Sequence, residues 1–131
     1  MHRKLLVIIL AMGMSPLASA AVTQDNFLVR STQDIVDLCK AGEKDPLYTA
    51  AVNFCQGYLV GAYDYYRASV AGPKKKPFVC PPEPAPSRNE AIQEFVKWAQ
   101  ANPQYMKDPA VETQFRFLVE KWPCPTKPKK K

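Results

Sequence analysis

Four cysteines restrict the folds open to this chain of 131 residues more than any other feature of its sequence. They are Cys39, Cys55, Cys80 and Cys124, and none of them forms the C-x-x-C pair that zinc-binding knuckles use. An even number of cysteines in an exported protein indicates disulfides. We therefore predict one small domain held together by two cross-links, with no metal site.

The first twenty residues have the layout of a secretory signal peptide. A basic start, His2 to Lys4, is followed by an apolar stretch that reaches Leu17, and Ala18 to Ala20 form the small-residue pattern that a signal peptidase cuts after. The apolar stretch is shorter than the about 20 residues of a membrane helix. We expect a signal peptide at 1–20, a single mature domain at 21–131, no membrane span, and a periplasmic location.

Charge in the predicted mature chain is concentrated at its end. Loss of Arg3 and Lys4 leaves 16 basic residues of the original 18 against 12 acidic ones. Four of the 16 lie in the basic tail, 126–131, so the remaining body is neutral. A nucleic-acid-binding protein would carry a basic face within the fold. Binding to nucleic acid is therefore not expected.

The predicted mature chain also has no histidine, because His2 is the only one in the sequence. Without it no Ser-His or Cys-His nucleophile pair can form, and no side chain has an unperturbed pKa near neutrality. The acidic pairs in the sequence are helical neighbours with capping or surface explanations. We predict a protein that is not an enzyme, has no catalytic residues and needs no cofactor.

Capping residues and prolines predict four helices. Ser31 with Asp34 and Ser87 with Glu90 are capping boxes, while Asp45 and Asp108 each stand before a proline at a helix start. The predicted helices are Thr32–Ala41, Pro46–Val70, Arg88–Ala101 and a last one from Asp108–Pro109 to Trp122.

Apolar residues recur at steps of three and four within these segments, which is typical of amphipathic helices. In the last helix the apolar positions are Val111, Phe115, Leu118 and Trp122. No alternating strand pattern longer than a few residues is present. The sequence therefore predicts an all-α, disulfide-stapled domain of four to five helices.

Helix order favours one of the three possible disulfide pairings. If the third and fourth helices are antiparallel, Cys124 returns to the start of the third helix, near Cys80. The predicted disulfides are then Cys80–Cys124 and Cys39–Cys55. The spacing of Gly57 and Gly61 is a G-x-x-x-G, which predicts either close packing inside one protomer or a dimer seam.

Two features could contact a partner protein. The loop from Gly72 to Pro86 is rich in prolines, and a stiff loop loses little entropy on binding; alternatively, the prolines only keep a connection from aggregating. The second helix carries clustered tyrosines, which favour an interface or a half-buried rim. The predicted partner-binding residues are Lys74, Lys75, Lys76, Phe78, Tyr63 and Tyr66.

Several segments in order along the chain resemble the Rap/Tai family of immunity proteins. Phe54-Cys55-Gln56-Gly57-Tyr58 followed by Gly61 is similar to the F-C-x-G-Y-x-x-G signature of that family. The other similar segments are Asp37-Leu38-Cys39, Phe78-Val79-Cys80-Pro81, Asn102-Pro103, Pro109-Ala110 and Pro123-Cys124. The resemblance extends from about Ser31 to Pro125.

The resemblance implies a small, all-helical, often dimeric periplasmic protein that protects its producer. Family members bind and block peptidoglycan amidase toxins of type VI secretion by inserting a surface segment into the catalytic groove of the toxin. It thus implies a cognate amidase effector as partner, and a possible homodimer. An alternative is a periplasmic stress or chaperone-like protein without a dedicated toxin. The lysines at 74–76 and in the tail have no counterpart in the family pattern.

Overall fold

The computed structural model of the chain describes residues 20–126, and all structural statements below concern that part. Within it there are four α-helices, two short 3-10 helices and no β-strand, which confirms the predicted all-α fold. The order is η1 (Gln24–Leu28), α1 (Thr32–Cys39), α2 (Tyr48–Val70), α3 (Arg88–Ala101), η2 (Pro103–Tyr105) and α4 (Ala110–Lys121). The predicted signal peptide and basic tail lie outside the described residues, apart from Ala20 and Thr126.

Both predicted capping boxes are present. The Ser31 hydroxyl accepts a hydrogen bond from the Asp34 amide, and the Asp34 carboxylate accepts one from the Ser31 amide at 3.2 Å. In the second box the Ser87 amide donates to the Glu90 carboxylate at 2.8 Å, and the Glu90 amide donates to the Ser87 hydroxyl at 3.3 Å. Each box satisfies amide groups that have no partner inside the helix.

Two predicted helix starts differ from the structure. Helix α2 begins at Tyr48 rather than Pro46, because the Asp45 carboxylate accepts from the Leu47 amide at 2.8 Å and holds residues 45–47 in a turn. The side chain of Asp108 does not cap α4. Its carbonyl oxygen instead accepts from the Thr32 amide at 2.8 Å, so the turn before α4 caps α1. Helix α1 also ends at Cys39, two residues before the predicted end at Ala41.

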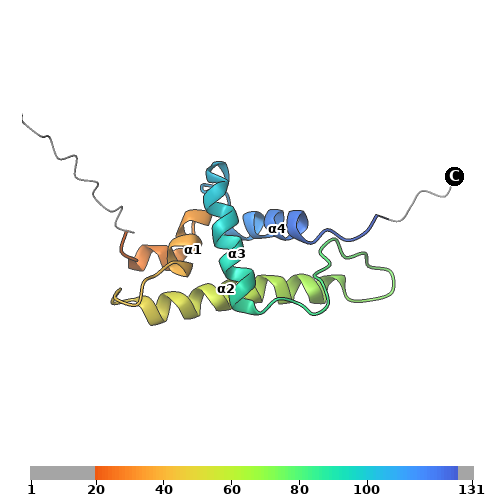
Figure 1. The fold of residues 1–131 in the computed structure, drawn as a ribbon, viewed down its shortest axis with the longest axis horizontal. Helices are drawn as coiled ribbons and strands as arrows, with labels where there is room; N and C mark the ends of the chain where they lie inside the picture. The colour runs from red at the N-terminus through yellow and green to blue at the C-terminus, as the bar shows by residue number, and fades with distance from the viewer. Residues whose placement is uncertain (1–19, 127–131) are drawn as a thin grey trace, which may run out of the picture.

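The longest helix, α2, lies along one side of the molecule (Figure 1). Helices α1 and α4 lie over its two ends, and α3 crosses it near the middle. The Gln56 side chain on α2 donates from Nε2 to the Asn89 Oδ1 at 3.0 Å, which marks where the start of α3 meets α2. The segment that connects α2 to α3 therefore has to return along half of α2.

Helix α1 supplies the centre of the core, with Ile35 and Leu38 fully buried. Other residues of the same core are buried side chains of α2, α3 and α4. They are Ala51, Cys55, Leu59, Tyr66, Phe95, Ala99, Ala110, Phe117 and Leu118. Each fully buried aliphatic side chain of this kind contributes about 1.5–3 kcal/mol relative to leaving it in water.

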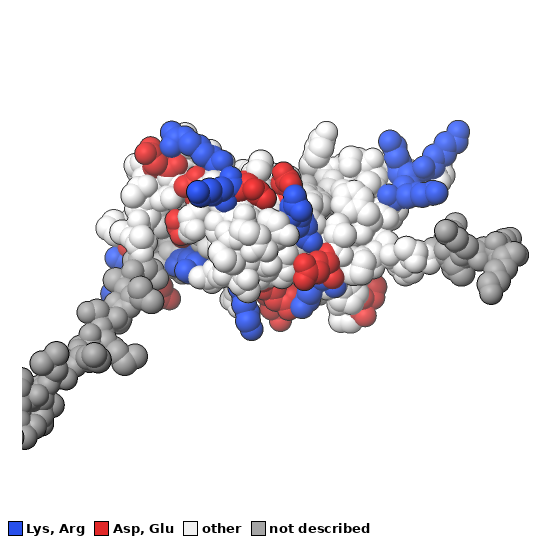
Figure 2. All heavy atoms as spheres, turned by 90° about the horizontal axis from the view of Figure 1, so that it is seen from above, with Lys and Arg blue, Asp and Glu red and all other residues white. Residues whose placement is uncertain are grey.

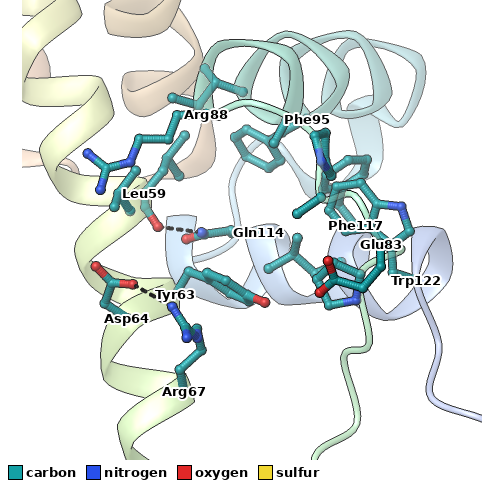
Figure 3. A pocket seen from close by; sticks show the side chains of 17 residues that line it. Leu59, Tyr63, Asp64, Arg67, Glu83, Arg88, Phe95, Gln114, Phe117 and Trp122 are labelled. Atoms are coloured by element: carbon teal, nitrogen blue, oxygen red, sulfur yellow. Dashed lines mark hydrogen bonds and ion pairs between the residues drawn. The ribbon is translucent and has the colours of Figure 1, made fainter.

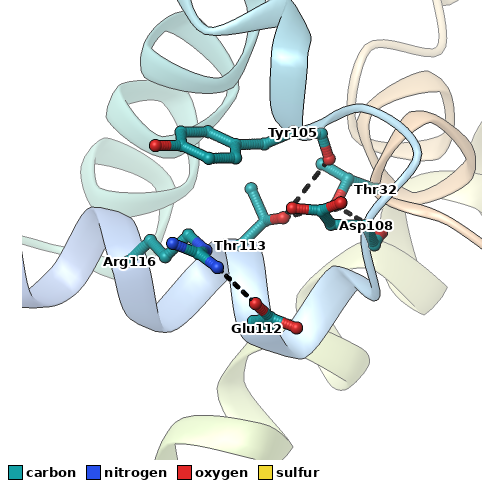
Figure 4. A network of polar contacts seen from close by, with 6 residues as sticks. All are labelled: Thr32, Tyr105, Asp108, Glu112, Thr113 and Arg116. Atoms are coloured by element: carbon teal, nitrogen blue, oxygen red, sulfur yellow. Dashed lines mark hydrogen bonds and ion pairs between the residues drawn. The ribbon is translucent and has the colours of Figure 1, made fainter.

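A buried polar contact joins α1 to α4 (Figure 4). The hydroxyl oxygens of Thr32 and Thr113 are 2.7 Å apart, and both residues are fully buried. The Thr32 hydroxyl also donates to the Asp108 carbonyl at 2.9 Å. On the surface nearby, Arg116 forms an ion pair with Glu112 and lies over the Tyr105 ring, 5.0 Å from its centroid. The buried contact between Thr32 and Thr113 holds the start of α4 against the start of α1.

The two disulfides have the predicted pairing. Cys39–Cys55 links the end of α1 to α2, and Cys80–Cys124 links the α2–α3 connection to the segment after α4.

The prediction that Gly57 and Gly61 allow close packing inside one protomer is wrong. Both glycines are exposed, and a Cβ added to either would meet no atom within 4 Å. The glycine pair therefore makes no close contact inside the protomer, whereas the Cys80–Cys124 disulfide does join the α2–α3 connection to the segment after α4.

Candidate partner-binding surface

The connection between α2 and α3 has two parts with different surroundings. Residues 71–78, here called the lysine limb, extend past the end of α2, and residues 79–87, the proline limb, run back toward the middle of α2 (Figure 1). The change of direction starts at Gly72, whose φ of 129° suits glycine, and its carbonyl accepts from the Lys75 amide at 3.2 Å.

Backbone and side-chain bonds hold the junction of the two limbs. The Tyr66 hydroxyl accepts hydrogen bonds from the amides of Phe78 at 2.8 Å and Val79 at 3.0 Å. Val79 also forms an antiparallel bridge with Pro123, and the Cys80 amide donates to the Trp122 carbonyl at 2.8 Å. Together with the disulfide at Cys80, these contacts fix the base of the lysine limb.

The three lysines at the tip are exposed and form no ion pair within the described residues. They are Lys74, Lys75 and Lys76. Figure 2 shows a group of positive side chains at the end of the molecule where this limb lies. Because no acidic residue stands between Ala71 and Pro82, the tip presents a local positive charge, while the rest of residues 21–126 holds more acidic than basic side chains.

Phe78 is the apolar centre of this surface. Its side chain is 48% exposed, with its ring 4.6 Å from Tyr66 and 6.1 Å from Phe115, measured between centroids. Phe115 belongs to α4 and was not predicted as part of a binding surface. In the sequence, Phe115 lies four residues from both Val111 and Val119, so the three share one side of α4. In the structure both valines are 40% exposed.

The predicted apolar stripe of α4 is therefore partly wrong. Val111 faces solvent, and the buried positions of α4 are Ala110, Thr113, Gln114, Phe117 and Leu118. Two of these buried positions, Thr113 and Gln114, are polar, so the apolar pattern of the sequence does not show which side of α4 is buried. Of the apolar side chains outside this stripe, Phe115 lies beside Phe78, and Val111 and Val119 are exposed.

The tyrosines of α2 differ in what they can offer a partner. Tyr66 is only 7% exposed and its hydroxyl is already used, so its contribution is to hold the lysine limb. Tyr65 is 78% exposed. Tyr63 is half-buried, and burial raises its pKa above the ordinary value, while Arg67 partly lowers it. A neutral Tyr63 hydroxyl is thus maintained at the surface of a cavity described next.

A cavity of about 490 Å³ lies between α2, α3, α4 and the proline limb (Figure 3). We call it the groove. Its apolar lining includes Leu59, Ile92, Phe95, Phe117, Leu118 and Trp122. Charged residues stand at its edge: Asp64, Arg67, Glu83 and Arg88. Asp64 and Arg67 approach to 3.8 Å, and both are largely exposed.

One polar side chain in the groove lacks a full set of partners. Gln114 extends from α4 to α2, where its amide nitrogen donates to the Leu59 carbonyl at 2.7 Å (Figure 3). Its oxygen is buried and accepts no hydrogen bond within the described residues. The sequence did not predict the groove, because its lining comes from four separate segments. Gln114 was not at a predicted core position of α4, and its burial is seen only in the structure.

None of the described helices is both long and apolar enough to cross a membrane. Comparison with protein families gave a match of residues 31–124 to the family model described as Rap1a immunity proteins. The matched range contains α1 to α4, both disulfides, both limbs and the groove. Comparisons with curated proteins and with solved structures gave no match.

Proposed function

Since the chain belongs to the Rap1a immunity protein family, we propose that it is a periplasmic protein that binds and inhibits a peptidoglycan amidase toxin delivered by type VI secretion. The observation that carries this proposal is the family match over residues 31–124. Two disulfides and the signal-peptide pattern at 1–20 support a location in an oxidising compartment outside the cytoplasm. The protein would act by stoichiometric binding rather than as an enzyme.

The lysine limb is the proposed inhibitory segment. Its base is fixed by Tyr66, by the bridge of Val79 with Pro123 and by the disulfide Cys80–Cys124, so little conformational entropy is lost on binding. Phe78 offers an exposed aromatic ring, the kind of side chain that dominates binding energy at interfaces. The lysines at 74–76 would accelerate association with an acidic partner surface.

We also propose that the protein can form a homodimer. The support is the exposed outer face of α2, where Gly57 and Gly61 meet no other part of the protomer. A second copy could approach the backbone closely at these positions. Sedimentation of the oxidised protein tests this proposal: a dimer that dissociates in the variant Gly57→Gln/Gly61→Gln supports it, and a monomer at all concentrations contradicts it.

The first experiment is a pull-down of the oxidised protein, residues 21–131, against the secreted effectors of its own source. We expect one amidase in a stoichiometric complex with nanomolar affinity, and loss of amidase activity in that complex. Recovery of many unrelated proteins would instead support the stress or chaperone-like function. A complex with a secreted protein of another activity would contradict the amidase assignment while leaving the immunity class intact.

A second experiment locates the contact. In the variant Lys74→Ser/Lys75→Ser/Lys76→Ser/Phe78→Ala, we expect loss of binding with the fold preserved. The matched control is Lys40→Ser/Lys44→Ser/Lys97→Ser, which removes three exposed lysines elsewhere and should bind as the unmodified protein does. Equal binding by both variants would show that the lysine limb lies outside the contact.

A further inference from the structure

The groove between α2, α3, α4 and the proline limb contains an acceptor without a donor. The oxygen of Gln114 is buried and receives no hydrogen bond, while the nitrogen of the same amide is fixed on the Leu59 carbonyl. Gln114 is only 5% exposed, and it lines the cavity. Buried polar atoms in proteins are nearly always paired, so a single unpaired acceptor at a cavity is a reason to look for a ligand.

The second polar group of the groove is a donor. The Tyr63 hydroxyl makes no hydrogen bond within residues 20–126, and burial raises the pKa of Tyr63, which keeps the hydroxyl protonated. An acceptor and a donor on the same cavity match the N–H and C=O of a peptide backbone. The torsion next to the glutamine amide is soft, which lets the Gln114 oxygen tilt toward an N–H in the groove.

The apolar lining of the groove determines which side chain of a bound peptide fits there. Phe95, Phe117 and Trp122 give the cavity aromatic walls, and Leu59 and Leu118 complete an apolar floor. Ring contacts of this kind favour an aromatic occupant through edge-to-face packing. A volume of about 490 Å³ is in the range of sites that take one side chain with its flanking backbone.

Charge at the edge of the groove argues against a charged occupant. Asp64 and Arg67 face each other at 3.8 Å, and the other two edge residues, Glu83 and Arg88, also have opposite signs. The edge therefore has no net charge. An edge with a net charge would favour a partner segment of the opposite charge. Because this edge has none, it fits a neutral segment.

We propose that the groove binds a segment of a protein partner that presents a neutral aromatic side chain flanked by backbone amides, with one N–H donated to Gln114. The inference rests on the proposed function for the identity of that partner, the inhibited toxin. The proline limb forms one wall of the groove and continues into the lysine limb, so one partner can reach both. The complex would be reciprocal, with a segment of each protein inserted into the other.

N-acetyl-L-tryptophanamide is the probe for this proposal, because it carries the aromatic ring and the amides without any toxin. We expect its titration into the ¹⁵N-labelled oxidised protein to shift the NMR signals of the Gln114 side-chain amide and of Leu59, Phe95 and Phe117. The matched probe 3-methylindole has the same ring and no amide. One hydrogen bond predicts about fivefold to tenfold weaker binding of 3-methylindole.

Variants separate the groove from the rest of the surface. Val60→Trp and Ala91→Trp each fill the groove from a different helix, and either should remove the shifts. Val111→Trp adds the same side chain to an exposed position of α4 outside the groove and should leave them unchanged. Gln114→Met should abolish the difference between the two probes while keeping apolar binding.

The proposal is overturned if the tryptophan amide shifts no groove residue, or if its shifts persist in a folded groove-filled variant. Equal affinity for both probes in the unmodified protein overturns the role of Gln114. None of these outcomes depends on a toxin, so they are distinct from a failure of the proposed function, which would appear as the absence of an amidase from the pull-down.

Discussion

At the scale of single residues, a few polar atoms inside an apolar environment decide how the binding surface is arranged. The Tyr66 hydroxyl holds two consecutive amides at the junction of the limbs, and the Thr32 and Thr113 hydroxyls hold α1 against α4. Each of these contacts links segments far apart in the sequence. Loss of one partner removes a hydrogen bond from groups that are buried or partly buried, which costs more than a bond lost at the exposed surface.

The first prediction concerns Tyr66. Replacement by Phe keeps the ring packing against Phe78 and Phe115 and removes the acceptor for two amides. We expect the free energy of unfolding to fall by about 1–2 kcal/mol, measured by urea denaturation of the oxidised protein. Tyr65→Phe is the control, because Tyr65 is exposed and its change should stay within about 0.5 kcal/mol. Equal stability of the two variants would contradict the role of the hydroxyl.

The second prediction concerns the threonine pair. Thr32→Val leaves the Thr113 hydroxyl buried beside a methyl group and removes a donor from the Asp108 carbonyl. A loss of about 1–3 kcal/mol in the free energy of unfolding is expected. The double variant Thr32→Val/Thr113→Val should cost less than the sum of the two single ones, because both partners become apolar together. Additive losses would show that the hydroxyls do not interact.

At the scale of elements, the two helix starts that carry capping boxes, those of α1 and α3, were predicted correctly. The boxes at Ser31 and Ser87 are formed by residues three positions apart, so their information is entirely local, and α3 has its predicted bounds. The Asp45 carboxylate, in contrast, also accepts a hydrogen bond from the Val22 amide, a residue 23 positions away. No local pattern predicts this contact, which, together with the bond from the Leu47 amide, engages the Asp45 carboxylate in the turn before α2.

The surface was harder to predict than the helices. The lysine limb could be identified from its composition, since prolines and lysines are visible in the sequence. The groove could not, because which side of α4 is buried depends on α1 and α3 rather than on α4 itself. The burial of Gln114 in place of Val111 illustrates this point. Tertiary packing overrides the apolar pattern of a single helix.

The third prediction uses the pH dependence of the second capping box. Hydrogen bonds from Ser87 lower the pKa of Glu90 from its ordinary value of 4.5. A lowered pKa stabilises the fold above pH 4.5, and that contribution is lost as the pH falls through the lowered value. The urea midpoint of the unmodified protein should therefore fall more between pH 7 and pH 3 than that of Glu90→Gln. Glu120→Gln, at a position without a hydrogen bond or ion pair in the described part, should keep the full fall.

The fourth prediction compares the two disulfides. Cys80–Cys124 joins residues 44 apart and Cys39–Cys55 joins residues 16 apart. Loop closure predicts losses of about 4 and about 3 kcal/mol on replacement of each pair by serine. Only Cys80→Ser/Cys124→Ser loosens the base of the lysine limb, so it alone should also weaken toxin binding at a temperature where both variants are folded. Equal weakening by both variants would argue against the limb as the contact.

At the scale of the whole molecule, the described domain combines a body of mixed charge with one local excess of positive charge. Figure 2 shows acidic and basic side chains interspersed over the helical part, apart from the basic group at the end. Both proposed contacts, the lysine limb and the groove, adjoin the same connection between α2 and α3. Tyr66 of α2 and the Cys80–Cys124 disulfide hold this connection in a fixed shape.

The last prediction follows from that distribution of charge. Long-range attraction by the lysines at 74–76 acts on the encounter, so the variant Lys74→Ser/Lys75→Ser/Lys76→Ser should associate with its toxin roughly tenfold more slowly at low salt. Added salt screens exposed charges beyond about 10 Å at 0.1 M and less at higher concentration, so the two association rates should converge in 0.5 M salt. Dissociation should change by less than about threefold, because exposed lysines contribute little once Phe78 is in place. Stopped-flow measurement of both rate constants checks this. A change confined to dissociation would mean that the lysines form buried ion pairs in the complex instead of guiding the encounter.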